Sequence, residues 1–237
     1  MRLDKLISSC GIASRTEITK AAAKGLITVD GKTVTKPSVH VDPEVNKVVY
    51  CGEEIIYREF YYVMLNKPQG YVCSTDDPRE RTVLELLPER LQKLDLFPCG
   101  RLDKDTLGLV ILTNNGQLAH RMLSPKHHVD KVYFFTARDK VSEDDVQKLE
   151  NGVDIGEGYI TKPAKVEMIE DKLGYITLTE GKYHQITRML EAVGNKIERL
   201  ERVAFAGIPL DNTLKRGEWR MLTDEEEKML EKNKNEE

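Results

Sequence analysis

Apolar and polar positions change their spacing several times along the 237 residues, and the changes mark the predicted elements. Ser14–Glu17 (SRTE) is a capping-box pattern, and it predicts a helix that runs to Lys24 and stops at Gly25. LITVDGKTV then predicts two short strands around an Asp30–Gly31 turn, and NKVVYCG predicts a third. We interpret residues 51–60, which are charged and contain a turn, as a linker.

Strands and helices alternate along the rest of the chain. Apolar strands are predicted at FYYVMLNKP, GLVILT and KVYFFTA, a helix ends near Met122, and Ser142 caps a short acidic helix. KVEMIE and YITLTEG predict an antiparallel pair, followed by a helix from Tyr183 to Gly194 and by strands at RVAFAGIPL and EWRML. Thr223 begins a charged terminal helix with a second capping box.

The pattern predicts an α+β fold, because strand-rich segments are interspersed with helices. We expect a small N-terminal domain over residues 1–58 and a larger domain over residues 59–237 with a mixed, mainly antiparallel sheet. Residues 223–237 are expected to form an acidic terminal helix or tail.

The composition restricts the class of protein. No apolar run approaches the ~20 residues of a membrane span, and the charges of Arg2, Asp4 and Lys5 do not fit a signal peptide, so we expect a cytoplasmic protein. The cysteines lack the spacing of zinc ligands or of a disulfide framework, and we expect them to be reduced: Cys10, Cys51, Cys73 and Cys99.

The net charge of −4 hides an uneven distribution. The last fifteen residues carry seven acidic and three basic side chains, which account for the whole excess. Residues 1–50 carry eight Lys and Arg against five Asp and Glu. Because local charge decides phosphate binding, the N-terminal domain is compatible either with RNA binding or with an ordinary solvated surface.

The tetrapeptide RLDK occurs twice, and its first copy opens MRLDKLISSCGIASRTE. Arg15 lies at the first turn of the predicted helix, where backbone N–H groups and the macrodipole favour a phosphate. The segment resembles the S4 (αL) RNA-binding domain, with its R-L-D-x-x-L, G-x-x-S-R and G-x-V-x-V-N-G patterns, over residues 2–50. The resemblance implies RNA contacts from Arg2, Lys5, Ser14, Arg15, Lys20, Lys24 and Lys32.

The second RLDK lies in GRLDKDTLGLVILTNNG, directly before a buried strand. Asp103 stands between an arginine and a lysine, so it would stay ionised and could act as a nucleophile. From residue chemistry alone, such a carboxylate is more often a structural ion-pair or turn residue. Gly100 and Gly108 would allow another backbone or a flat ligand to approach closely.

This segment resembles the G-R-L-D-x-x-T-x-G-L motif of pseudouridine synthases, and in particular the ribosomal-RNA branch that carries an S4 domain. LNKPQGYVCST, LSPKHHVDKVYFFT and LTEGKYHQITRMLEAVGN resemble three further motifs of that branch, in the same order. The resemblance implies a cofactor-free, metal-free enzyme that acts as a monomer on ribosomal RNA. The forms of SPKHH and EGKYHQ are most similar to those of enzymes that modify 16S RNA, within a pre-ribosomal particle.

The resemblance also implies roles for single residues. The reaction breaks the N1–C1′ bond of a flipped-out uridine, rotates the uracil and rejoins it through C5, with Asp103 as the nucleophile and Tyr133 on the uracil face. Arg101 would help to hold the displaced RNA backbone or fill the vacated place in the base stack. Further substrate contacts are expected from Lys67, Lys104, Lys182, His184 and Gln185.

One position departs from the family pattern. Related enzymes have an Arg or Lys two positions after the glutamine, to pair with the catalytic carboxylate, whereas this chain has Thr187 followed by Arg188. Adjacent helix positions are ~100° apart. Arg188 is nevertheless our candidate for the pairing role, with Lys104 or Lys182 as substitutes.

Other interpretations stay open at this stage. A 23S RNA enzyme and a non-catalytic RNA-binding or ribosome assembly factor are the main alternatives. Cys99 would suit a cysteine-dependent RNA methyltransferase, but no Gly-rich cofactor turn accompanies it. His120, His127, His128 and Asp130 do not have the spacing of a metal site, and no metal is expected.

Overall fold

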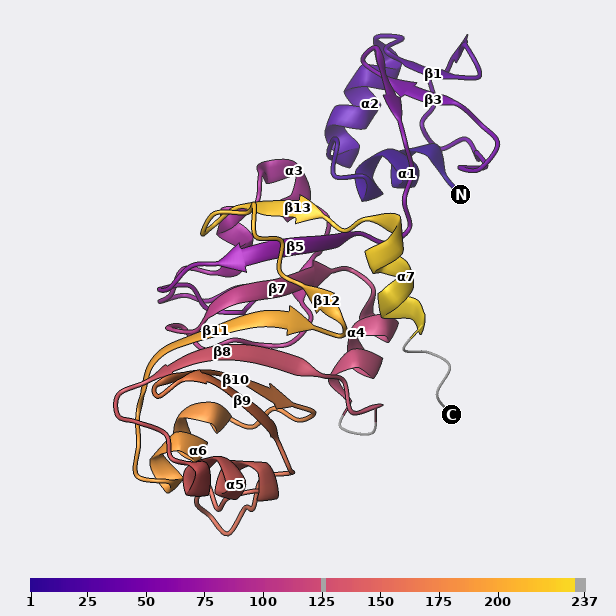
Figure 1. Cartoon of the computed structure of the whole chain (residues 1–237). Helices are drawn as coiled ribbons and strands as arrows, with labels where there is room; N and C mark the ends of the chain where they lie inside the picture. Colours follow the sequence, from indigo (N-terminus) through magenta and orange to yellow (C-terminus); the bar gives the residue numbers. More distant parts are fainter. Residues whose placement is uncertain (125–126, 233–237) are drawn as a thin grey trace. The chain divides into compact units, whose positions relative to one another are not determined.

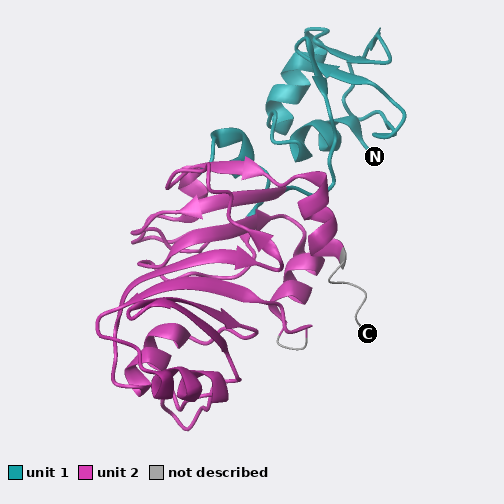
Figure 2. Cartoon of the chain, viewed as in Figure 1, with its two compact units in different colours: residues 1–61, 87–96 teal, residues 62–86, 97–237 magenta. Residues whose placement is uncertain are grey.

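The computed structural model describes residues 1–124 and 127–232 (Figure 1). The chain forms two compact units (Figure 2). Unit 1 consists of Met1–Tyr61 and Leu87–Leu96, and unit 2 of Tyr62–Leu86 and Phe97–Glu237. No helix of the described ranges is long and apolar enough to cross a membrane.

Unit 1 combines two helices with a four-stranded antiparallel sheet in the order β2-β1-β3-β4. These two helices are α1 (Leu3–Ser9) and α2 (Arg15–Ala23). A third, short helix, α3 (Glu89–Gln92), comes from later in the chain and also belongs to unit 1. The strands are β1 (Ile27–Val29), β2 (Lys32–Thr33), β3 (Val48–Tyr50) and β4 (Glu53–Ile55).

Local signals explain the helices of unit 1. The Ser14 hydroxyl accepts the backbone N–H of Glu17, and the Glu17 carboxylate accepts the N–H of Ser14, so the predicted capping box is confirmed. Ile18, Ala21 and Ala22 are buried at the i, i+3, i+4 spacing of one helix face. They join Leu3, Leu6, Ile7 and Ile27 in the core of the unit.

The interpretation of residues 51–60 as a linker was wrong in part. Glu53–Ile55 forms β4 and pairs antiparallel with β3. Cys51 and Gly52 both have positive φ angles, 50° and 89°, and they close a two-residue hairpin turn. Cysteine is not a residue that normally marks such a turn, so the local sequence gave little indication of it.

Unit 2 is built on a nine-stranded sheet, in the order β13-β5-β7-β11-β8-β10-β9, with β12 paired to β11 and β6 to β7. The strands are β5 (Tyr62–Lys67), β6 (Phe97–Pro98), β7 (Leu107–Thr113), β8 (Lys131–Ala137), β9 (Lys165–Glu170), β10 (Leu173–Leu178), β11 (Ile197–Phe205), β12 (Ile208–Pro209) and β13 (Trp219–Met221). Every pairing in this sheet is antiparallel except that of β7 with β11. The predicted α+β class with a mixed, mainly antiparallel sheet is confirmed.

The helices of unit 2 are η1 (Val83–Leu86, a 3-10 helix), α4 (Gly116–Leu123), α5 (Glu143–Asn151), α6 (Gln185–Ala192) and α7 (Asp224–Lys232). The predicted caps at Ser142 and Thr223 precede two of them, α5 and α7. Apolar side chains of α4 and α7 share one core cluster with β5, β7 and β11. Residues 233–237, the end of the predicted terminal helix or tail, lie outside the described residues.

Gly108 explains how β7 and β11 approach each other. Its φ is 99°, and a Cβ there would lie 2.3 Å from the carbonyl oxygen of Arg202. Only glycine tolerates both conditions. The parallel pairing brings the residues that follow Gly100 next to the middle of β11, and this is where the candidate site lies.

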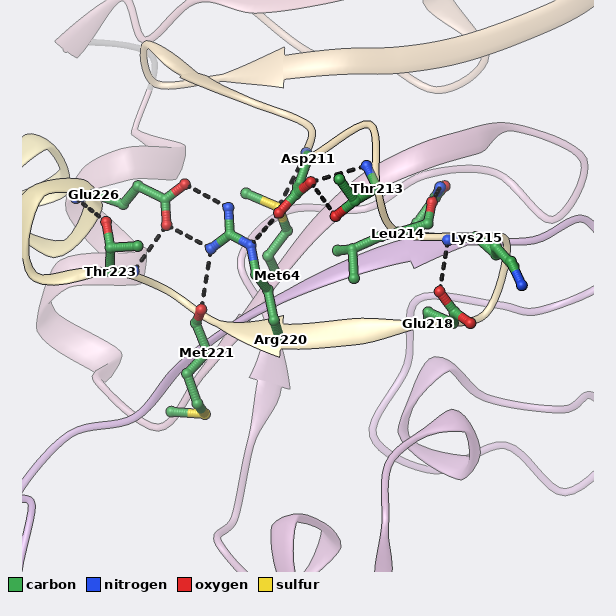
Figure 3. Close-up of polar contacts among 11 residues, drawn as sticks. Met64, Asp211, Thr213, Leu214, Lys215, Glu218, Arg220, Met221, Thr223 and Glu226 are labelled. Atoms are coloured by element: carbon green, nitrogen blue, oxygen red, sulfur yellow. Dashed lines mark hydrogen bonds and ion pairs between the residues drawn. The ribbon is translucent and has the colours of Figure 1, made fainter.

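The C-terminal helix is fastened to the sheet by Arg220 of β13 (Figure 3). Its Nε donates to Oδ2 of Asp211 at 2.6 Å, and its two terminal nitrogens donate to the carboxylate of Glu226 at 2.7 and 2.8 Å. Glu226 also accepts the backbone N–H of Thr223 at 2.8 Å, which confirms the second capping box.

Candidate active site

A cavity of about 500 Å³ opens in unit 2. Its wall combines three parts of the chain: the loop from Gly100 to Asp103, the segment from Thr179 to Thr187, and side chains of β8 and β11. Ligand pockets in proteins typically have volumes of 300–1,000 Å³. The cavity is therefore large enough for a nucleotide.

Asp103 lies on this wall, in the loop before β7. Its carbonyl accepts the N–H of Thr106 at 3.1 Å, which closes a turn, and its side chain is 40% exposed. Oδ1 lies 3.4 Å from Nε2 of His184. In the described part of the chain, His184 is the residue within ion-pair distance of this carboxylate.

Lys67 stabilises the backbone of the Asp103 loop by hydrogen bonds. Its side chain is fully buried at the end of β5, and Nζ donates to the carbonyls of Pro68, Asp103, Lys104 and Thr106 at 2.8–3.2 Å. Burial lowers the pKa of Lys67 to about 8. Lys67 thus contacts the loop and not the cavity, since it is absent from the cavity wall.

His184 occupies an unusual backbone position at the start of α6. Its φ of 49° and ψ of 37° are left-handed, a conformation that costs a non-glycine residue about 1 kcal/mol or more. Its ring stacks on Tyr183 with centroids 3.9 Å apart, and Tyr183 is 72% exposed. The turn therefore presents two aromatic rings at the cavity.

Thr187 lines the cavity, whereas Arg188 does not. The guanidinium of Arg188 donates to the carbonyl of Tyr183 at 3.3 Å and lies close to Gly156. At the position where relatives are expected to have a basic residue, this chain thus has a threonine that lines the cavity. The pairing of Arg188 with Asp103 stays a prediction.

Gln185 and Glu180 fix the shape of the segment that leads into α6. The Gln185 side chain, which is buried, accepts the N–H of Lys182 and donates to Glu180. Burial acts to raise the pKa of Glu180, but hydrogen bonds from Tyr159, Lys162 and Gln185 outweigh it and leave the pKa below its ordinary value. Lys182 lies over the ring of Tyr159, 4.3 Å from its centroid.

Tyr133 is 92% buried in β8 and reaches the cavity wall. Arg202 of β11 lies opposite it in the sheet register, and its side chain is 1% exposed. The sequence interpretation did not include Arg202 or Lys131, which also lines the cavity. An arginine within the apolar segment RVAFAGI was the available signal, because charged residues are rarely fully buried without a role.

The two basic residues of the second RLDK have different surroundings. Arg101 is exposed and lines the cavity. The Nζ of Lys104 donates to Glu80 at 2.7 Å on the surface, and Lys104 is absent from the cavity wall. Of the two, Arg101 is the one placed to meet a ligand in the cavity.

The surroundings of Cys99 do not favour a reactive thiolate. All four cysteines are free, and burial raises the pKa of Cys99 to about 11, which makes its thiolate scarce at neutral pH. Within residues 1–124 and 127–232, no group of three His, Cys, Asp or Glu side chains could hold a metal ion. Pro125 and Lys126 of the SPKHH segment lie outside the described residues.

In unit 1, the residues predicted to contact RNA lie on the surface. Arg15 is exposed at the first turn of α2, and Arg2 is paired with Asp4 at 2.6 Å. The Ser14 hydroxyl is already engaged in the capping box. The remaining predicted residues are all exposed: Lys5, Lys20, Lys24 and Lys32.

Comparison with known proteins agrees with this arrangement. Residues 61–192 match the RNA pseudouridylate synthase family, and residues 1–46 match the S4 domain. The chain is 47% identical over 234 residues to the uncharacterized RNA pseudouridine synthase YtzG of Bacillus subtilis, covering 97% of this chain and 98% of that protein. It is 43% identical over 228 residues to ribosomal small subunit pseudouridine synthase A of Escherichia coli K12, covering 95% and 98%.

A crystal structure of a pseudouridylate synthase superposes on the chain with a TM-score of 0.69 and 39% sequence identity. The superposition covers 97% of this chain and 99% of the other. The match extends over both units and includes the segments that surround the cavity. The chain therefore belongs to the RNA pseudouridylate synthase family, as an isomerase with an N-terminal S4 RNA-binding domain.

Proposed function

We propose that this protein converts one uridine of 16S ribosomal RNA to pseudouridine. The observation that supports the chemistry best is the position of Asp103 on the wall of a nucleotide-sized cavity that Tyr133 also lines. The relatives named for the ribosomal small subunit, at 43% identity over nearly the whole chain, support the choice of 16S RNA. The substrate would be RNA within a pre-ribosomal particle, and the enzyme would act as a cytoplasmic monomer.

In this proposal, residues 1–58 anchor the RNA and residues 59–237 perform the reaction. Phosphate contacts position a protein on its nucleic acid without reading its sequence. The exposed basic side chains of unit 1 suit that role. The RNA-contacting residues would be Arg2, Lys5, Arg15, Lys20, Lys24 and Lys32, with Ser14 fixing the helix end that carries Arg15.

The target uridine must leave its stack to enter the cavity. Asp103 then acts as the nucleophile, and Tyr133 lies against the uracil. Arg101, which is exposed at the wall, holds the displaced backbone. Lys67 affects the substrate indirectly, because its hydrogen bonds to four backbone carbonyls position the loop that carries Asp103.

The remaining predicted substrate residues divide into two groups. His184 and Lys182 line the cavity with side chains that can meet RNA, while Gln185 shapes the segment that carries them. Lys104, which bonds to Glu80, would need to leave that partner. Arg188 would need to leave the Tyr183 carbonyl before it could pair with Asp103.

Carbodiimide mapping of pseudouridine tests the proposal. 16S and 23S RNA would be taken from cells with and without the gene, and from cells complemented with the wild type, with Asp103→Asn or with Asp105→Asn. Asp105→Asn is the matched control, because it makes the same change in the same loop at a residue absent from the cavity wall.

We expect one 16S site to disappear without the gene and to return with the wild type and with Asp105→Asn, but not with Asp103→Asn. A lost 23S site would support the large-subunit alternative. Unchanged modification of both RNAs, with binding preserved, would support the non-catalytic RNA-binding or assembly factor.

A further inference from the structure

Arg202 carries a positive charge that no described residue neutralises. Its Nε donates to the carbonyl of Leu109 at 2.8 Å, and its guanidinium lies 5.0 Å from the ring centroid of Phe205. One terminal nitrogen, Nη2, is buried and has no hydrogen-bond partner among residues 1–124 and 127–232. Burying a charged donor without a partner is unfavourable, so a residue of this kind suggests an absent ligand.

Lys131 adds a second positive charge on the same face of the sheet. Residues 131 and 133 of β8 point to the same side, and Tyr133 lies opposite Arg202. All three side chains line the cavity. Burial, and after it the positive charge of Arg202, lower the pKa of Lys131.

The carboxylates of Asp130 and Glu180 act on the charge of Lys131 less strongly than Arg202 does. No ion pair in the described part of the chain involves Arg202 or Lys131, and the Nζ of Lys131 donates to the carbonyl of Val129 at 3.0 Å. By contrast, Arg199 and Arg216 both bind Glu201 nearby in sequence. Two cations at a cavity wall without an ion-pair partner among the described residues favour an occupant with negative charge.

Of the parts of a flipped nucleotide, the base suits this part of the wall better than a phosphate does. A flipped nucleotide enters a pocket with its base first, while its phosphates stay with the RNA backbone at the mouth. Arg202 is 1% exposed, whereas Asp103, which must reach the ribose or the base, is 40% exposed. The cations therefore belong to the more enclosed part of the wall.

We propose that Arg202 and Lys131 stabilise the negative charge of the detached uracil ring. This inference rests on the proposed isomerisation. When the N1–C1′ bond breaks, its electron pair leaves with N1, and the charge spreads to the ring carbonyl oxygens O2 and O4. C1′ is left electron-poor beside the Asp103 carboxylate, and after the ring rotates it accepts the electron pair of C5. C5 then loses a proton and N1 gains one, so no further reactant is needed.

The first test separates turnover from RNA binding. Arg202→Met, Arg202→Lys and Lys131→Met would be compared with the wild type by tritium release from 16S RNA labelled at uridine C5, under single turnover. Arg138→Met and Lys140→Met are the matched controls, since both side chains are exposed and paired with Asp139 and Asp171. Circular dichroism and thermal unfolding show whether each variant is folded.

We expect Arg202→Met to slow turnover by about 10²-fold, as for the loss of a donor to a developing anion, while RNA binding changes less than about twofold. Lys131→Met should slow it by about tenfold, Arg202→Lys should recover part of the loss, and the controls should match the wild type. An Arg202→Met protein that is folded and turns over at the wild-type rate would overturn the inference.

The second test needs no RNA. Equilibrium dialysis measures the binding of 5-nitrouracil, an anion near neutral pH, with neutral uracil and thymine as controls for the ring and for a C5 substituent. We expect the wild type to prefer 5-nitrouracil by about tenfold or more and Arg202→Met to lose that preference. Equal preference for 5-nitrouracil in the wild type and in Arg202→Met would overturn the inference. Absence of 16S modification by the wild type in the carbodiimide mapping would instead overturn only the proposed function.

Discussion

The imidazole Nε2 of His184 lies 3.4 Å from Oδ1 of Asp103, while the helix position expected to supply the counter-charge is Thr187. His184 reaches this place because its backbone adopts a left-handed conformation at the start of α6. Strained backbone is commonly found where a side chain must be aimed at a functional group. His184 thus occupies the position beside the carboxylate that an arginine was expected to fill.

Replacing His184 by Ala is expected to slow turnover about tenfold, equivalent to ~1.4 kcal/mol, because Asp103 loses its neighbouring polar ring. Adding Thr187→Arg should recover most of the loss, since position 187 faces the cavity. Single-turnover tritium release measures both variants, and His120→Ala, at an exposed histidine of α4, is the control. A double variant no faster than His184→Ala would contradict this reasoning.

Arg188→Ala distinguishes the two candidates for the counter-charge. If Arg188 leaves the Tyr183 carbonyl and pairs with Asp103 when RNA binds, its removal will slow turnover at least as much as His184→Ala. If His184 alone has that role, Arg188→Ala will retain turnover close to the wild-type rate. The comparison therefore tests the assignment made from the sequence.

Lys67→Met is expected to destabilise unit 2 by about 3 kcal/mol, because four carbonyl groups lose their shared donor in a buried position. Urea unfolding measures the change. Lys104→Met removes a lysine from the same part of the chain, but its partner Glu80 is on the surface, so it should have a much smaller effect. Equal stability of the two variants would contradict the structural role of Lys67.

The RNA-binding role of unit 1 predicts a change in salt dependence. Arg15→Glu should weaken RNA binding and lower the slope of log affinity against log salt by about one, because a phosphate contact is lost. Ser14→Ala should instead destabilise α2 by about 1 kcal/mol through loss of its cap, with the slope unchanged. Filter binding across a salt series, with Lys140→Glu as the charge control, measures both.

Local chemistry explains which features were predictable. The capping boxes at Ser14, Ser142 and Thr223 each lie within four residues, and the helices begin there. The buried run GLVILT likewise became β7. Asp103 and Tyr133 were identified by resemblance, and the structure places both on the cavity wall.

The missed features depend on segments that are distant in sequence. The apolar sequence around Arg202 suggests burial, but only the pairing of β11 with β8 places Arg202 opposite Tyr133. The approach of His184 to Asp103 depends on a single left-handed residue, which periodicity does not reveal. Tertiary pairing decided the position of Arg202, and a strained local backbone conformation decided that of His184.

The hydrogen bonds of Arg220 to Asp211 and Glu226 should make the stability of unit 2 depend on pH in the acid range. Hydrogen bonds from Thr213 and then from Arg220 lower the pKa of Asp211 to about 2, and Arg220 also lowers the pKa of Glu226 (Figure 3). Both carboxyls have a lower pKa in the folded state than in the unfolded chain, so the folded state binds fewer protons. Their contribution to the free energy of unfolding is complete above the unfolded pKa values of about 4, and it is lost as the pH falls towards 2.

Arg220→Met is expected to lower the free energy of unfolding by about 2 kcal/mol at pH 7, because Glu226 loses a bidentate partner and α7 loses its attachment to β13. It should also flatten the decline in stability between about pH 5 and pH 2, since the depressed pKa of Glu226 depends mainly on Arg220. Urea unfolding across that pH range measures both effects, with Arg138→Met as the control. An unchanged acid decline in Arg220→Met would show that these carboxyls are held by other contacts.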